Sequence, residues 1–354
     1  MNSSLFEPLK LGALQLPNRI VMAPLTRMRA HEDRTPSEAM IQYYSDRSGA
    51  GLIIAEATSV SPMGVGYPKT PGIWSEKHVE GWKPITQAVH KKNGRIFLQL
   101  WHVGRVSDPV YLDGKFPVAP SAEAPGGFVS GIRPQKSFVT PRALELSEIP
   151  AIVNEFRVAA GNALKAGFDG VEIHGANGYL LDQFLQDGSN KRTDVYGGSI
   201  ENRARLMLEV VDAVVSVCGA ARVGLHLSPR GEAHSMFDSN PLVTFSYVVE
   251  QVKKRNIAFI FSREAHDGAG YLGKVLKEKF GGVYIANQNL TQSQAERIVQ
   301  TREADAVAFG RLFIANPDLP VRFLKNALLN EPDPSTFYSS GEQGYNDYPF
   351  YSVH

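Results

Sequence analysis

The chain has 354 residues, 43% hydrophobic and 21% charged, which is an ordinary mix for a globular protein. Its 37 basic and 36 acidic residues give a net charge of +1, so we expect no nucleic-acid or membrane partner. The single cysteine, Cys218, excludes an internal disulfide and a multi-cysteine metal site, and it suits a reducing, cytoplasmic location. No apolar run is long enough to span a bilayer, and the N-terminus lacks a secretory-signal pattern.

The first half of the chain predicts short strands separated by helices. Residues 9–16 alternate about a Gly-Ala turn, which indicates a small hairpin that caps the main body. Strands are expected at 20–23, 52–57 and 95–100. The Thr35–Glu38 sequence reads as a capping box that starts a helix running to Arg47, and Ser75 reads as the cap of a helix to about Lys92. Residues 103–147 are proline-rich and too long for an ordinary connection, so we expect an excursion after strand 3 at the pocket mouth.

The second half continues the alternation. Strands are expected at 170–174, 222–227, 257–261, 283–286 and 306–309, and helices at 148–166, 199–218, 244–255, 275–280 and from a second capping box, Thr291–Gln294. Eight strands alternating with helices predict an α/β fold, a single (β/α)8 TIM barrel with the N-terminal hairpin as a cap. No linker or repeat is present, so residues 1–354 are expected to form one domain.

Polar side chains follow one strand in a close group: His174, Asn177 and Tyr179, with Gly175 and Gly178 between them. An imidazole and an amide can donate hydrogen bonds to a substrate oxygen, and a phenol can donate a proton. In a barrel these groups lie at the catalytic end, since barrel chemistry sits at the carboxyl ends of strands. A buried polar turn is the structural alternative for this spacing when it is taken alone.

Residues after the last two strands predict a phosphate site. Asn287, Gln288 and Asn289 follow strand 7, and Gly310 and Arg311 follow strand 8, which offers backbone amides and one guanidinium. A surface role for Arg311 is the alternative. Gly268–Gly273 matches the dinucleotide pattern G-x-G-x-x-G, but it does not directly follow a strand and no acid lies at the required distance. We therefore interpret it as a loop.

Several segments together resemble the Old Yellow Enzyme family of ene-reductases. They are Ala23-Pro-Leu-Thr26, Gln99-Leu-Trp-His-Val-Gly-Arg105, His174 through Leu185, Arg192-Thr-Asp, Tyr196-Gly-Gly-Ser-Ile-Glu-Asn-Arg203 and Ala306 through Leu319. The resemblance covers nearly the whole chain in order. It implies a TIM barrel that binds FMN non-covalently, takes hydride from NADPH or NADH in a ping-pong cycle, and reduces the C=C bond of unsaturated carbonyl, maleimide or nitro compounds.

The resemblance also implies roles for single residues. Pro24, Leu25, Thr26, Ala57 and Gln99 would surround the flavin ring, and Gly310, Arg311 and residues 287–289 would hold the phosphate. Thr26, Tyr67, Trp101, His174 and Asn177 would contact the substrate. His174 and Asn177 would hold the substrate oxygen, and Tyr179 would donate the proton. This agrees with the chemistry of hydride addition, which places enolate charge on oxygen.

Two positions depart from the family pattern. The family commonly has arginine near flavin N1 and O2, where this chain has His226 after strand 5. We expect His226 to replace it in part as a charge partner that titrates near neutral pH, with Arg230 and Arg263 as the other candidates. The turn after strand 7 carries Asn287–Asn289 in place of the glycines often found there.

Two other hypotheses remain open at the level of sequence. One is a flavin-free barrel lyase or aldolase acting on a phosphorylated substrate, although no lysine ends a strand to form a Schiff base. The other is a non-catalytic flavin-binding protein. The expected partners are small activated alkenes and NAD(P)H, no metal is expected, and the chain is expected to be a monomer or a homodimer.

Overall fold

The computed structural model describes residues 3–266 and 270–352. In this part of the chain, eight parallel strands close into a barrel in which each strand pairs with its neighbours and β12 pairs back to β3. The strands are β3 (Ile20–Met22), β4 (Leu52–Ser59), β5 (Ile96–Trp101), β8 (Gly170–His174), β9 (Val223–Leu227), β10 (Phe259–Arg263), β11 (Val283–Asn287) and β12 (Ala306–Phe309). They are rich in apolar and β-branched residues, because parallel barrel strands are covered on both faces. The predicted α/β TIM barrel is confirmed.

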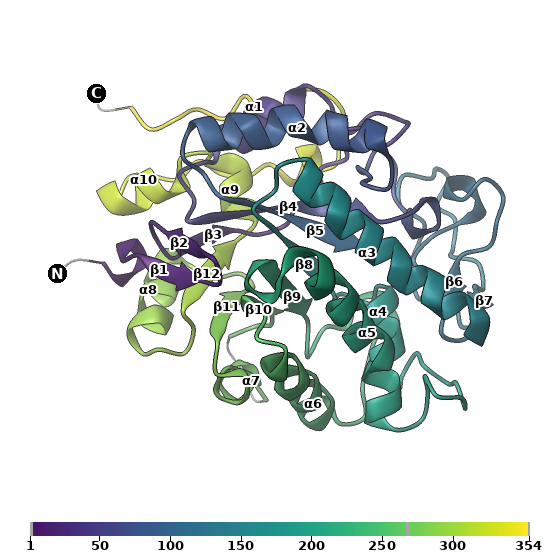
Figure 1. Cartoon of the computed structure of the whole chain (residues 1–354). Coiled ribbons are helices and arrows are strands. Elements are labelled where there is room, and N and C mark those ends of the chain that lie inside the picture. The colour runs from purple at the N-terminus through teal and green to yellow at the C-terminus, as the bar shows by residue number, and fades with distance from the viewer. Residues whose placement is uncertain (1–2, 267–269, 353–354) are drawn as a thin grey trace.

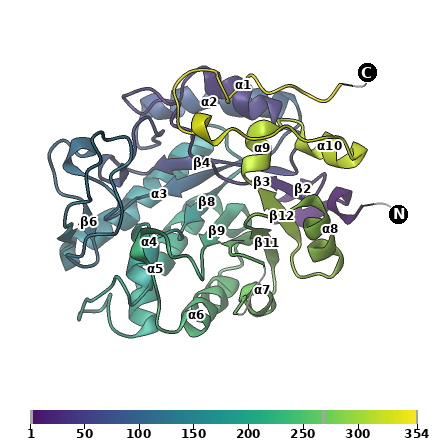
Figure 2. The ribbon, with the colours of Figure 1, turned by 180° about the vertical axis from the view of Figure 1, so that it is seen from behind.

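Helices surround this barrel on the outside (Figures 1 and 2). They are α1 (Ala39–Asp46), α2 (Glu76–Lys91), α3 (Ile149–Lys165), α4 (Leu180–Leu185), α5 (Ile200–Cys218), α6 (Pro241–Lys254), α7 (Gly273–Phe280), α8 (Gln292–Gln300), α9 (Arg311–Ala315) and α10 (Leu319–Lys325). The predicted caps of α2 and α8 are present, since Ser75 accepts from the amide of His78 and Thr291 forms a capping box with Gln294. Among the described residues, no helix has the length and apolar character needed to cross a bilayer.

The start of α1 differs from the prediction. The helix begins at Ala39 with Glu38 before it, so Thr35 does not cap it. The Thr35 hydroxyl instead donates to the carboxylate of Asp33 at 2.6 Å, which closes a local turn. Short polar side chains often bond to nearby backbone or side-chain groups in this way and so compete with a helix cap.

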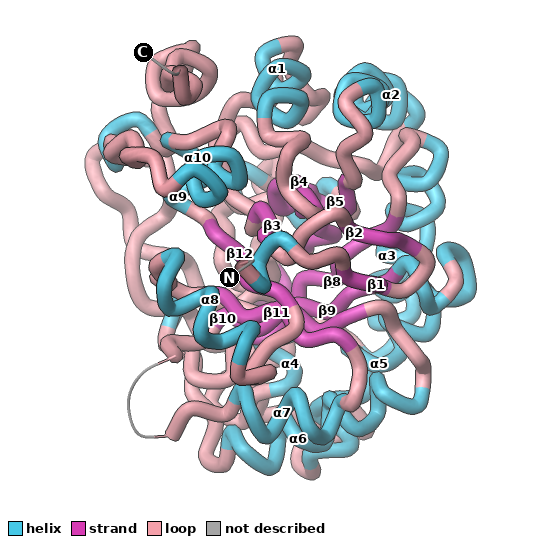
Figure 3. The backbone as a smooth tube through the Cα atoms, turned by 90° about the vertical axis from the view of Figure 1, so that its left-hand side faces the viewer, coloured by secondary structure: helices cyan, strands magenta, loops and turns pink. Residues whose placement is uncertain are grey.

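The N-terminal hairpin closes one end of the barrel. Its strands are β1 (Leu9–Leu11) and β2 (Leu14–Leu16), and the buried side chains of Leu11 and Leu16 join the barrel-interior cluster with Phe97 and Phe259. Figure 3 shows the hairpin on the viewer's side of the ring of strands. Since the amide of Ala13 donates to the carbonyl of Ala221, just before β9, the hairpin covers the amino-terminal end of the strands. The opposite end is therefore left for the functional site.

The predicted excursion after β5 holds only short elements, including the two-residue strands β6 (Val118–Ala119) and β7 (Arg142–Ala143). It returns to the carboxyl end of the barrel, where Phe138 packs against a cluster that contains Ala57 and Trp101. The G-x-G-x-x-G pattern begins at Gly268 and continues through Ala269, which lie outside the described residues, and α7 begins at its last glycine.

Two buried arginines hold the C-terminal tail against the end of β3. Arg27 donates to the carbonyls of Phe337 at 3.0 Å and Gly344 at 2.7 Å. Arg29 donates to the carbonyls of Thr336 and Phe337, both at 3.0 Å. Because Arg27 directly follows Thr26, these bonds place the tail beside the expected site.

Candidate active site

The turn after β8 carries the His174-x-x-Asn177-x-Tyr179 group in a strained backbone conformation. Asn177 and Gly178 have φ values of 58° and 77°, which are in the left-handed region. The Asn177 amide donates to the Ser228 hydroxyl at 2.7 Å, and the Gly178 amide donates to the Asp182 carboxylate at 2.9 Å. A Cβ atom at position 178 would lie 2.8 Å from the carbonyl oxygen of Ala233, so only glycine fits. The turn is therefore fixed in one shape.

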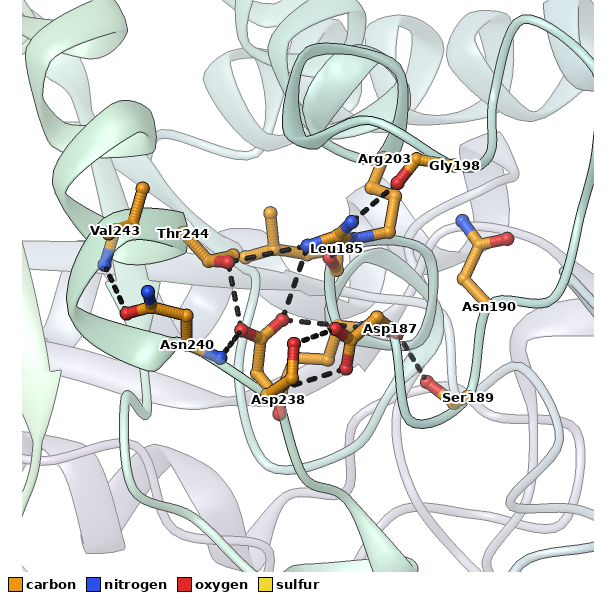
Figure 4. Close-up of polar contacts among 12 residues, drawn as sticks. Leu185, Asp187, Ser189, Asn190, Gly198, Arg203, Asp238, Asn240, Val243 and Thr244 are labelled. Carbon is orange, nitrogen blue, oxygen red and sulfur yellow. Dashed lines mark hydrogen bonds and ion pairs between the residues drawn. The ribbon is translucent and has the colours of Figure 1, made fainter.

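A polar network behind this turn joins α4, α5 and the segment before α6 (Figure 4). Arg203 donates to the carbonyl of Leu185 at 2.8 Å and to that of Gly198 at 2.6 Å, and it lies 3.5 Å from the Asp238 carboxylate. Thr244 also donates to Asp238, at 2.9 Å. These contacts account for the arginine of the Tyr196–Arg203 motif. Its glycines have steric reasons, since Gly198 has a φ of 79° and a Cβ at Gly197 would lie 2.1 Å from the carbonyl oxygen of Arg192.

His174 and Asn177 are both held as hydrogen-bond donors toward the site. Nδ1 of His174 accepts from the Ala176 amide at 3.3 Å, which leaves the imidazole proton on Nε2. Burial, and then the neighbouring His226, lowers the pKa of His174 well below its usual range, so the ring is neutral. Oδ1 of Asn177 accepts from Arg263 at 2.9 Å, which leaves the Asn177 amide hydrogens available.

Tyr179 lies in an aromatic cluster. Its hydroxyl is 2.9 Å from the Tyr67 hydroxyl, and its ring meets that of Trp101 edge-on with centroids 5.0 Å apart. Tyr67 stacks on Trp101 at 5.3 Å. Burial raises the pKa of Tyr67 to about 12 and that of Tyr179 well above 10, so both phenols carry their protons at neutral pH.

A cavity of about 700 Å³ opens beside this cluster, within the size range of small-molecule sites. Its wall includes predicted cofactor residues from four strand ends: Pro24, Leu25, Thr26, His226, Asn287, Gln288, Asn289, Gly310 and Arg311. Asn177 and Arg263 reach it from the substrate side, and Phe337 and Tyr338 of the tail close another side. Among the described residues, Arg311 forms no ion pair.

The turn after β11 reaches a conformation that usually requires glycine. Gln288 and Asn289 have φ values of 130° and 50°. Such residues cost about 1–3 kcal/mol each and are concentrated at functional sites. The Asn287 side chain donates to the carbonyl of Ala308 at 2.8 Å, which ties the turn to β12. The turn thus keeps its shape without the glycines common in the family.

A buried polar group lies under the cavity. Nε2 of Gln99 donates to the Glu172 carboxyl at 2.7 Å and to Nδ1 of His226 at 2.9 Å. Burial, and then Arg263, lowers the pKa of His226 to about 3. His226 is therefore a neutral ring in this structure, and its expected titration near neutral pH as a charge partner of the reduced flavin stays a prediction. Arg230 and Arg263 are the other two candidates for the charge partner of the flavin. Arg230 pairs with Glu264, and Arg263 lies at the cavity.

Every residue predicted for the site lies at the carboxyl end of the barrel, although in two adjoining parts. Tyr67, Trp101, His174 and Tyr179 form the aromatic part, with Ala57 packed beside them. The other cofactor candidates line the cavity, except Gln99, which is buried beneath it. Sequence reasoning missed Glu172, Phe138, the tail, and His234, whose Nδ1 lies 2.8 Å from the Asn177 carbonyl oxygen. No local motif marked these residues.

In residues 3–266 and 270–352, no group of three or more histidine, cysteine or acidic side chains is placed to hold a metal ion.

Comparison with known proteins assigns the family. The structure matches that of the Old Yellow Enzyme homologue from Zymomonas mobilis with a TM-score of 0.95 and 45% identity, over 98% of this chain and 99% of that one. The model of the "NADH:flavin oxidoreductase / NADH oxidase family" matches residues 4–330. The chain belongs to the Old Yellow Enzyme family. It is therefore an oxidoreductase, as the resemblance in the sequence predicted.

Two other Old Yellow Enzyme relatives are similar over almost their whole length. Morphinone reductase in complex with tetrahydroNAD has a TM-score of 0.95 and 49% identity, over 99% of this chain and 98% of that one. The "Probable flavin mononucleotide-dependent alkene reductase" of Leishmania infantum is 44% identical over 98% of this chain and 97% of its own. The barrel fold is thus shared with morphinone reductase over almost the whole chain.

Proposed function

We propose that this protein binds FMN non-covalently, takes hydride from NADPH or NADH in a ping-pong cycle, and reduces activated C=C bonds. The substrate class is α,β-unsaturated carbonyl, maleimide and nitro compounds. The observation that carries the proposal is the pairing of two fixed neutral donors, His174 and Asn177, with the Tyr179 phenol beside a cavity of about 700 Å³. The names of the relatives from Leishmania infantum and of morphinone reductase support the flavin and the nicotinamide donor.

The residues at the cavity fit a flavin nucleotide. Nε2 of His226 is buried and has no hydrogen-bond partner among the described residues, and the ring lines the cavity, so it can donate to the polar edge of an isoalloxazine. Leu25 and Gly310, which both line the cavity, approach each other so closely that a Cβ at position 310 would lie 3.1 Å from the leucine side chain. At the other end Arg311 and the 287–289 turn offer a guanidinium and backbone amides for a phosphate.

FMN held by the residues of the cavity would supply the hydride for the β-carbon of the substrate. His174 and Asn177 hold the carbonyl or nitro oxygen and stabilise the negative charge that develops on it. Tyr179 gives its hydroxyl proton to the α-carbon, and Tyr67, 2.9 Å away, can stabilise the resulting phenolate. The aromatic cluster of Tyr67 and Trp101 excludes water from this step.

The proposal is tested first by the purified protein itself. We expect a bound yellow chromophore that is released on denaturation as FMN, bleaching by NADPH or NADH without substrate, and recovery of colour on addition of 2-cyclohexenone. A colourless protein that does not bind added FMN would favour the flavin-free lyase. A yellow protein that NAD(P)H bleaches but that reduces no enone, maleimide or nitroalkene would contradict the substrate assignment alone.

A further inference from the structure

A fully buried carboxyl group lies beneath the cavity, and the reaction proposed above does not use it. Glu172 is on β8, and one of its oxygens accepts from Nε2 of Gln99 at 2.7 Å. Its other oxygen, Oε1, has no hydrogen-bond partner among the described residues. An ionised carboxylate with a single hydrogen bond is very unfavourable in a protein interior, and burial raises the pKa of Glu172 to about 8. The group therefore carries a proton at neutral pH.

A base that faces the cavity lies beside this carboxyl group. Nδ1 of His226 on β9 is 3.5 Å from Oε2 of Glu172, and the two side chains share the same amide donor, Nε2 of Gln99. Since Nδ1 accepts from Gln99, the imidazole proton is on Nε2. That atom is buried and unpartnered among the described residues, and the ring borders the cavity. His226 thus connects Glu172 to whatever occupies the cavity.

We propose that Glu172 and His226 share one mobile proton, which stays on Glu172 while the flavin is oxidised and moves to Nδ1 of His226 when the flavin is reduced. This inference rests on the proposed FMN site. The O–H bond of Glu172 breaks and an N–H bond forms on His226, so the pair remains neutral while its positive end moves toward the cavity. The electrons come from NAD(P)H through the flavin, and no further reactant is needed.

The charges around the pair explain why the proton stays on Glu172 until the flavin is reduced. Burial and Arg263 from β10 both disfavour an imidazolium at position 226. Negative charge in the cavity opposes their effect, and it acts more strongly on His226, which borders the cavity, than on the deeper Glu172. The carboxylate that remains can accept from His226 and Gln99 together, and these two hydrogen bonds replace the two that Gln99 donates to Glu172 and His226 in the neutral state.

The pair would therefore supply a cation only in the reduced state. Glu172 does not line the cavity, so it is a positioning residue that acts through His226. An arginine at position 226 would also stabilise the reduced flavin. Because its charge is permanent, it would in addition attract anions to the cavity while the flavin is oxidised. In this chain Arg263 and Arg311 are the arginines that line the cavity and attract anions in both redox states.

Infrared difference spectroscopy of the FMN holoenzyme, reduced with dithionite at pH 7, tests this directly. We expect reduction to remove the C=O stretch of one protonated carboxyl group, a band that shifts in D₂O. The band should be absent from Glu172→Gln, and it should persist through reduction in His226→Asn. Glu56→Gln, which removes another fully buried carboxyl group, is the matched control and should keep the change. Survival of the change in Glu172→Gln would assign it to another residue and overturn the proposal.

A second measurement needs no folded Glu172 variant. In ¹⁵N-histidine NMR of the wild-type holoenzyme, the His226 signals should be those of a neutral ring protonated at Nε2 in the oxidised state and of an imidazolium in the reduced state. Loss of these signals in His226→Asn provides the assignment. A neutral His226 in both states overturns the proton transfer but leaves the proposed function intact if the flavin turns over. A protein that holds no flavin overturns both.

Discussion

The chemistry of each key side chain is set by its second hydrogen bond. His174 is a donor because the Ala176 amide occupies its other nitrogen, and Asn177 is a donor because Arg263 occupies its oxygen. Tyr179 is positioned by its bond to Tyr67. Each residue type alone would allow either role, so the catalytic assignment depends on partners from other strands.

For Tyr179→Phe we expect two unequal effects. The variant keeps the ring and its contact with Trp101 but loses the acid, so the oxidative half-reaction with 2-cyclohexenone should slow by about 10²–10⁴-fold. Flavin reduction by NADPH needs no proton at this site and should stay close to wild type. Stopped-flow traces of both half-reactions make the measurement. Tyr67→Phe, which keeps the Tyr179 hydroxyl but removes its hydrogen-bond partner, should slow the oxidative half-reaction less than Tyr179→Phe does. Equal slowing of both half-reactions would mean that Tyr179 is structural.

For Arg263→Met we expect weaker substrate binding, because the Asn177 amide loses the bond that orients it. Loss of one such hydrogen bond corresponds to about a 3- to 10-fold rise in the Kd of an enone for the oxidised enzyme. Arg263→Lys, which keeps the charge and one donor, should have a smaller effect. The Kd values come from titration of the flavin absorbance. An unchanged Kd in the methionine variant would show that Asn177 is held by other contacts.

At the level of elements, the catalytic turn depends on packing behind it. The Arg203–Asp238 network joins the end of α4, the helix that directly follows the turn in the chain, to the starts of α5 and α6 (Figure 4). Since Asp182 of α4 accepts the Gly178 amide, movement of α4 would also move Asn177 and Tyr179.

Replacement of Arg203 tests that dependence. Arg203→Met should lower the free energy of unfolding by about 3–5 kcal/mol, because it leaves the Asp238 carboxylate and two carbonyls in the interior without their partner. Arg205→Met, which removes a partly exposed arginine of the same helix, should cost less than about 1 kcal/mol. Chemical denaturation of both variants gives the comparison. Equal losses would mean that helix propensity or a shared contact, and not the buried network, is responsible.

The elements were predicted well where the signal was local. All eight barrel strands lie within about two residues of the expected ranges because each is a short buried apolar run. Helices α4, α9 and α10 were missed because runs of five to seven residues show no clear helical period. The false start of α1 at Thr35 shows the limit of a cap motif, since its hydroxyl found another partner in Asp33.

The site was predicted by position and by family, but its proton states were not. The barrel topology brings strand ends together, so the candidates at those ends converge whatever their identity. The neutral state of His226 depends on burial by Phe261 and on Arg263, both from the next strand. Both partners are distant from residue 226 in the sequence, so no local pattern predicts them. The same holds for the pairing of Glu172 with Gln99 across β8 and β5.

The molecule as a whole holds an unusual set of ionisable groups in neutral form. Burial raises the pKa of Glu56 and Asp182 to about 7 and that of Glu172 to about 8. Burial also lowers the pKa of His102 and His226 to about 3. The neutral form of each group is favoured because water is excluded around it, and each group regains its ordinary pKa when the chain unfolds.

The stability of the protein should therefore decrease as the pH rises from about 6.5 to 8.5. In this window the unfolded chain has already released the protons of Glu56, Asp182 and Glu172, while the folded chain still holds them up to about pH 7–8. The folded state binds more protons, so its stability falls by up to about 1.4 kcal/mol per pH unit for each group still protonated. Below about pH 6.5 the buried neutral histidines act in the opposite sense, because they protonate only on unfolding.

Urea denaturation at constant saturating FMN, repeated across this pH range, measures the slope of the free energy of unfolding against pH. Glu172→Gln cannot bind the extra proton and should show a shallower decrease than wild type, most clearly between pH 7 and 8. Glu250→Gln removes a surface carboxyl group paired with Lys279 and should leave the slope unchanged. Stability that rises with pH between 6.5 and 8.5 would contradict the raised pKa values of the three carboxyl groups taken together. Equal slopes in wild type and Glu172→Gln would show that Glu172 itself is ionised in the folded protein. It would then need a compensating charge, for which the imidazolium of His226 is the nearest group on the neighbouring strand.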